Sequence, residues 1–139
     1  MRRFSFLALV LVIACGTGGG SARPASVAQP EVRAELAHDV FFGSGTTAPA
    51  TVDVTVTNRA NVPIMLRRVE VSSPGMAQYG IYTTFRDFRE TIQPGETKSV
   101  PVFATAVTTV RNPNEPLTIR AIADFEAAGK VWREVVMSR

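Results

Sequence analysis

The chain of 139 residues contains one cysteine, Cys15, and one histidine, His38. A single cysteine excludes an internal disulfide and the zinc sites that depend on several thiolates. A single histidine with carboxylates scattered along the chain provides no ligand cluster for a metal ion. We therefore expect neither a metal nor a cofactor.

Sets of catalytic residues are equally scarce. His38 could act as a general base only beside a nucleophile, and Ser44, within Gly43–Gly45, is the nearest candidate. Gly43–Gly45 lacks the Lys-Ser or Lys-Thr continuation of a phosphate-binding loop. We interpret His38 as an ordinary strand residue, and Asp124 and Glu126 as one solvated face of a strand rather than an acid–base pair. The sequence predicts a protein that is not an enzyme.

Long apolar runs are also few. The run Phe4–Ala14 is interrupted only by Ser5, and a membrane-spanning helix needs roughly 20 apolar residues. It follows two arginines and ends at Cys15, which is the three-part pattern of a secretory leader. Residues 1–14 are therefore predicted to be a signal peptide.

The end of this leader, Val12-Ile13-Ala14-Cys15, resembles the lipobox of bacterial lipoprotein precursors. The resemblance implies a diacylglyceryl group on the Cys15 sulfur, cleavage by signal peptidase after Ala14, and acylation of the new N-terminus. Two or three acyl chains, such as palmitate, would anchor the protein stably in a membrane. An ordinary secretory leader with a cysteine near the cut is the alternative.

The residue after Cys15 is Gly16 and not an aspartate. This resembles the pattern that directs lipoproteins to the outer membrane in many two-membrane bacteria. We therefore expect a lipid-anchored protein of the bacterial cell envelope, at the outer membrane where the host has two membranes.

Charge of one sign is in little excess. The chain has 15 Lys and Arg against 12 Asp and Glu, and removal of Arg2 and Arg3 with the leader leaves 13 against 12. The arginines are scattered, whereas a nucleic-acid interface needs a basic cluster. We expect no nucleic-acid partner.

Residues 15–30 are rich in Gly, Ser, Ala and Pro and show no apolar periodicity. They are predicted to form the lipidated cysteine and a flexible tether. From Glu31 the pattern changes to short β-rich runs with turn residues between them, so residues 31–139 are predicted to be one β domain. The expected strands are Val32–Phe42, Thr51–Thr57, Ile64–Val71, Tyr79–Ile92, Thr97–Ala104, Leu117–Glu126 and Val131–Met137.

Several of these strands carry specific expectations. The apolar phase slips between Leu66 and Val69, which predicts a β-bulge near Arg67 and Arg68. Pro101 has no N–H, so its strand is expected to be an edge or bulged there. Tyr79–Ile92 fits either a twisted strand or a short helical turn. In the last strand, either Val131, Val135 and Met137 or Trp132 and Val136 could face the core.

About seven short strands in the domain predict an all-β, antiparallel two-sheet sandwich. The order of strands and the Gln93–Thr97 turn resemble immunoglobulin-like and fibronectin III-like domains. Val54–Ile64 is also weakly similar to late-embryogenesis-abundant type 2 domains, in which a strand ends in Asn-Pro-Asn before an apolar strand. In this chain Arg59 and Ala60 stand where that motif has its proline, and the literal Asn112-Pro113-Asn114 lies more than 50 residues further along the sequence.

One aromatic segment is a candidate for binding, because aromatics and arginine dominate recognition surfaces. The possible binding surface is Tyr79, Tyr82, Arg86 and Arg89; in the competing interpretation at least one of Phe85 and Phe88 fills the core. The leading functional hypothesis is a lipid-anchored, non-enzymatic protein that binds or scaffolds another envelope component. The alternative is a carrier or sensor of a small apolar or lipid ligand, held in a pocket lined by Tyr79, Tyr82, Phe85 or Trp132.

Overall fold

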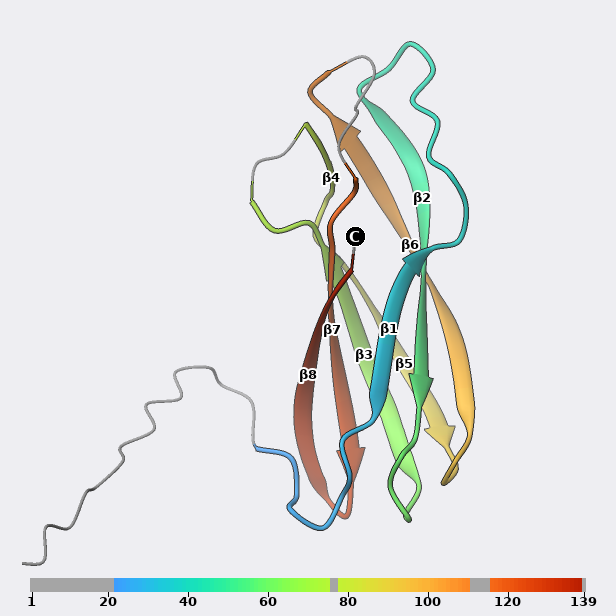
Figure 1. Ribbon diagram of the computed structural model, residues 1–139, viewed down its shortest axis with the longest axis vertical. Helices are drawn as coiled ribbons and strands as arrows, with labels where there is room; N and C mark the ends of the chain where they lie inside the picture. Colours follow the sequence, from blue (N-terminus) through green and yellow to red (C-terminus); the bar gives the residue numbers. More distant parts are fainter. Residues whose placement is uncertain (1–21, 76–77, 111–115, 139) are drawn as a thin grey trace, which may run out of the picture.

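The computed structural model describes residues 22–75, 78–110 and 116–138, and these form two packed antiparallel sheets with no helix (Figure 1). The predicted all-β, immunoglobulin-like sandwich is confirmed. The predicted leader, its cleavage site after Ala14, Cys15 and the Asn112–Asn114 turn lie outside the described residues. Within the described residues, no helix has the length and apolarity to cross a membrane.

Each sheet contains four strands. The first has the order β1-β2-β6-β4, and the second has the order β5-β3-β7-β8. These match the ABED and C′CFG orders of immunoglobulin domains, except that the short β4, in the D position, precedes β5 in the chain. The strands are β1 (Glu31–Leu36), β2 (Thr47–Thr57), β3 (Ile64–Ser72), β4 (Tyr79–Ile81), β5 (Thr84–Ile92), β6 (Thr97–Thr108), β7 (Ile119–Ala127) and β8 (Lys130–Ser138).

Strict alternation along the central strands builds the core between the sheets. Val52, Val54 and Val56 of β2 are fully buried, as are Ala121, Ala123 and Phe125 of β7. Trp132 is 1% exposed and stacks on Phe125, with ring centroids 5.7 Å apart. The last strand therefore uses Trp132 for the core and leaves three apolar residues exposed on the other face: Val131, Val135 and Met137.

The predicted bulge in β3 is confirmed. The register of β3 with both β5 and β7 shifts between Leu66 and Arg68. Relative to β7, the extra residue in β3 leaves Arg67 and Arg68 both exposed, whereas four apolar residues before and after them face the core: Ile64, Leu66, Val69 and Val71.

The edge position of Pro101 is also confirmed. Pro101 lies opposite Asp53 of β2, and β4 pairs with β6 only from Ala106 onward. The Pro101 carbonyl accepts a hydrogen bond from Arg86 Nη1 of β5 at 2.9 Å. Because the N and O of one strand residue point to the same side, the proline nitrogen also lies on the open edge, where no ladder bond is lost.

Several strand boundaries differ from the prediction. β2 begins at Thr47 rather than Thr51, and β6 ends at Thr108 rather than Ala104. The first strand ends at Leu36, because its ladder with β2 stops there and the chain then turns through a loop that contains Gly43 with φ of 56°. His38 is therefore an exposed loop residue rather than a strand residue. Tyr79–Ile92 is neither one strand nor a helical turn, but two strands, β4 and β5, that belong to different sheets.

The predicted tether is too long, because its C-terminal part packs on the domain. Val27 is 1% exposed within the core, and Pro24 and Pro30 are buried. Gln29 Nε2 donates to Glu134 of β8 at 2.9 Å. Arg23 pairs with the same carboxylate at 3.7 Å and donates to the Val27 carbonyl. The folded unit thus includes residues 23–30 and does not begin at Glu31.

Candidate binding groove on the outer face of the second sheet

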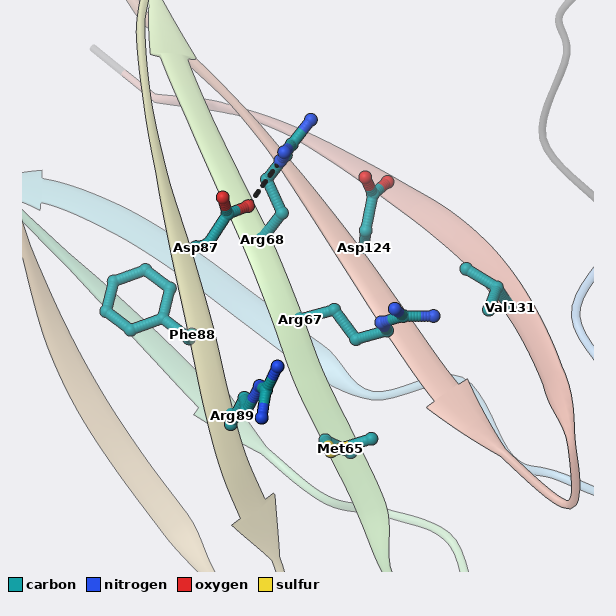
Figure 2. A pocket seen from close by; sticks show the side chains of 8 residues that line it. All are labelled: Met65, Arg67, Arg68, Asp87, Phe88, Arg89, Asp124 and Val131. Atoms are coloured by element: carbon teal, nitrogen blue, oxygen red, sulfur yellow. Dashed lines mark hydrogen bonds and ion pairs between the residues drawn. The ribbon is translucent and has the colours of Figure 1, made fainter.

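A hollow of about 720 Å³ lies on the outer face of the second sheet (Figure 2). Arginine and acidic side chains from β3, β5 and β7 line it, and an exposed valine of β8 closes one margin. We call this hollow the arginine groove; it is defined by Met65, Arg67, Arg68, Asp87, Arg89, Asp124 and Val131. Phe88 also borders the hollow, but in Figure 2 it extends from β5 to the side opposite Arg89.

The bulge in β3 explains why two consecutive arginines reach the groove. In a regular strand, successive side chains point to opposite faces, so one of Arg67 and Arg68 would enter the core. Relative to β7, β3 contains one extra residue between Leu66 and Arg68, and both arginines point outward. Beta-bulges commonly re-aim side chains in this way next to functional sites.

Ion pairs connect each strand of this sheet to its neighbour. Arg68 Nε contacts Asp87 Oδ1 of β5 at 2.6 Å, and Arg67 Nη1 contacts Glu126 Oε2 of β7 at 3.1 Å. Arg133 Nε of β8 contacts Asp124 Oδ1 at 2.8 Å. These pairs are partly exposed, and such pairs each contribute only about 0–1 kcal/mol to stability. Their main effect is to hold the guanidinium groups in place.

Two of these ion pairs shift pKa values toward the charged forms. The hydrogen bond from Arg68 holds the pKa of Asp87 below its usual range, and the same bond raises the pKa of Arg68. Asp124 raises the pKa of Arg133 in the same manner. Asp87, Arg68 and Arg133 are therefore ionised near pH 7.

Arg89 differs from the other groove arginines. It is exposed on β5 and extends toward β3 on the side where Arg67 lies (Figure 2). Among the described residues, no carboxylate oxygen lies within 4.0 Å of its guanidinium nitrogens. Counting only the part of the chain that the structure describes, Arg89 is therefore the groove arginine without a carboxylate partner, which makes it the first candidate to contact an external anion.

The four residues predicted as one binding surface do not lie together. Tyr79 packs against the core with its ring edge-on to Phe42, at 5.5 Å between centroids, and burial raises its pKa. Tyr82 is 55% exposed and follows β4, in the other sheet from Arg89. Only Arg89 belongs to the groove.

Arg86 lies at the open side of the sandwich. Its guanidinium carbon is 5.1 Å from the ring centroid of Phe88 and 5.7 Å from that of Phe103. These ring contacts and the hydrogen bond from Arg86 to the Pro101 carbonyl link the edge of β5 to the edge of β6. Lys98 reinforces the link by donating to the Thr91 carbonyl at 2.8 Å.

The remaining predicted candidates are dispersed. Asp124 and Glu126 do share one face of β7, and each pairs with an arginine. His38 and Ser44 are exposed in one loop with no hydrogen bond between them. In the described ranges, no three His, Cys, Asp or Glu side chains gather as a metal site would require.

The predicted lining of an apolar ligand pocket is also separated. Trp132 is in the core, whereas Tyr82 and Phe85 are 55% and 60% exposed. The carrier hypothesis stays a prediction.

Sequence reasoning missed Arg67 and Arg68 as site residues, although the phase slip that revealed the bulge also implied that both point outward.

No protein-family model and no curated protein matches the chain. The X-ray structure of Northeast Structural Genomics Consortium target SoR45 has a TM-score of 0.51 at 12% identity, covering 83% of this chain and 84% of that one. This likeness shows the fold alone. The crystal structure of a protein from Archaeoglobus fulgidus has a TM-score of 0.46 at 11% identity, over 78% and 90% of the two chains. The FixG-related protein from Vibrio parahaemolyticus has a TM-score of 0.36 at 11% identity, over 80% and 95%.

Proposed function

We propose that this chain is a lipid-anchored, non-enzymatic protein of the bacterial cell envelope that binds another envelope component through the arginine groove. The observation that carries the anchoring is the apolar leader that ends in Val12-Ile13-Ala14-Cys15. The groove supports the binding role, because it combines arginine with apolar side chains on a rigid sheet face, and arginine is enriched at recognition surfaces.

The packing of the N-terminal segment limits how far the domain can move from such an anchor. Eight residues, 16–23, separate Cys15 from the buried Pro24. A fully extended chain spans at most 3.3–3.6 Å per residue, so this connection reaches about 30 Å at most. The proposed anchor would therefore hold the domain close to the bilayer.

The anchoring is tested by Cys15→Ser. Wild-type protein should partition into the detergent phase of Triton X-114 and carry the mass of a chain that starts at Cys15 with added acyl groups. The variant should be uncleaved or aqueous, since oxygen does not replace the thiol in the lipidation reaction. Ser21→Ala, outside the leader, should behave as wild type. A wild-type chain that is aqueous and has an unmodified mass would contradict the proposal.

A further inference from the structure

We propose that the arginine groove binds an extended acidic segment of a protein partner. This inference rests on the binding role proposed above and specifies the chemistry of the partner. Three features carry it: the charge of the sheet face, the hydrogen-bond donors that its arginines keep free, and the apolar side chains that lie between them.

The charge of the face favours an anionic ligand. Among the described residues, five arginines and four carboxylates project from the outer face of the second sheet, and the carboxylates are all engaged with arginines. Arg89 has no such partner. The arginines are Arg67, Arg68, Arg89, Arg120 and Arg133, and the carboxylates are Glu70, Asp87, Asp124 and Glu126.

The paired arginines keep donors for a second oxyanion. A guanidinium has five N–H groups, and Arg68 uses one of them, at Nε, for Asp87. Because exposed ion pairs are weak, a ligand carboxylate can share Arg67 or Arg68 at little cost. The existing pairs also fix the side chains in advance, which reduces the ordering cost of binding.

Apolar groups beside the arginines favour a peptide over a simple polyanion. Phe85, Asp87 and Arg89 share the outer face of β5, and the Arg68 guanidinium carbon is 4.8 Å from the Phe85 ring centroid. Phe85 is 60% exposed and Val131 is 38% exposed. An extended segment that carries acidic and apolar side chains in turn along one face, at every second position, would meet both kinds of group, whereas a phosphate polymer would leave the apolar ones uncovered.

The outer face of the first sheet provides an internal comparison. It is dominated by hydroxyl side chains, with pairs such as Thr55–Ser99 and Thr57–Thr97. Its exposed Arg33 is held by Glu31 at 2.6 Å. A charge reversal at Arg33 therefore controls for the general electrostatic effect of losing one arginine.

The test uses the full chain in detergent micelles and a fluorescein-labelled peptide of two Glu-Ser-Leu-Ser-Asp-Ser-Val-Ser repeats, which places the acidic and apolar side chains on one face of an extended chain. Binding is followed by fluorescence anisotropy at about 0.15 M salt. The neutral analogue, with Gln and Asn in place of Glu and Asp, should bind at least tenfold more weakly. Arg89→Glu should weaken binding of the acidic peptide at least tenfold, and Arg33→Glu less than twofold. Circular dichroism should show the same fold for both variants.

The inference is overturned if the acidic peptide does not bind, if Arg89→Glu and Arg33→Glu have equal effects, or if inorganic polyphosphate displaces the peptide at an equal concentration of charge. The measurement in micelles does not require a lipid on Cys15. Repeating it with Cys15→Ser therefore separates failure of the groove from failure of the anchor.

Discussion

At the scale of single residues, Asn58 fixes one end of the sandwich. Its side chain is 0% exposed, and its Nδ2 donates to the carbonyls of Val62 at 2.8 Å and Ile92 at 2.9 Å. Its Oδ1 accepts from the Ala60 N–H at 2.8 Å. One side chain thus joins the turn after β2 to the end of β5.

Replacement of Asn58 should therefore be severe. Asn58→Ala leaves two buried polar groups and one partly buried carbonyl without their partner. Each buried group costs about 1–3 kcal/mol, so the free energy of unfolding should fall by about 3 kcal/mol or more. Asn61→Ala, at an exposed position of the same turn, should change it by less than about 0.5 kcal/mol. Urea denaturation measures both. Equal midpoints and slopes for the two variants would contradict this role of Asn58.

At the scale of elements, β5 shows why an aromatic residue at every third position does not make one surface. A strand alternates faces, so Phe85 and Phe88 point to opposite sides. Phe88 packs against the core, whereas Phe85 lies outside near Arg68. The prediction that at least one of these rings contributes to the core agrees with this packing.

The two rings of β5 should respond differently to truncation. Phe88→Ala removes a partly buried ring and should lower the free energy of unfolding by about 2 kcal/mol, less than the 3–5 kcal/mol of a fully buried one. Phe85→Ala loses only an exposed contact with Arg68 and should cost less than about 1 kcal/mol. Guanidinium denaturation of both variants decides this, and a larger loss for Phe85→Ala would reverse the assignment.

Strands that bury one face were predictable because each carries its own pattern. Thr51–Thr57 and Leu117–Glu126 alternate clearly, and the phase slip at Arg67 located the bulge. The end of β1 and the division of Tyr79–Ile92 between sheets depend on which strands pair, which no local pattern specifies. The groove was missed for the same reason, since Arg67, Arg89 and Asp124 come together only through the order β5-β3-β7.

At the scale of the whole molecule, residues 23–30 before β1 belong to the folded unit. Their composition predicted a flexible tether, because Gly, Ser, Ala and Pro carry no period. Val27 docks the segment together with the buried Pro24 and Pro30, and Gln29 and Arg23 bond to Glu134. One buried valine between Ser26 and Ala28 produces no periodic signal.

Limited proteolysis tests this docking. Elastase, which cuts after small residues, should spare the bonds after Ala25 and Ala28 in the wild-type protein. Val27→Asp should expose them and raise the cleavage rate at least tenfold, because a buried unpaired charge displaces the segment. Ser26→Asp, at an exposed position that keeps both alanines, should leave the rate within twofold. Intact-mass spectrometry identifies the cuts, and equal rates for the two variants would show that Val27 does not hold the segment.

The contacts between this segment and β8 also set an order of events during synthesis. Gln29 bonds to Glu134, 105 residues later, and Ser138 bonds to the Ala34 carbonyl across 104 residues. If the chain is exported N-terminus first, as the proposed function implies, it cannot form these two bonds until β8 arrives. Closing a loop of this length is entropically costly, so it belongs to a late step of folding. The proposed lipid on Cys15 would hold the incompletely folded chain at the membrane until β8 has formed its contacts.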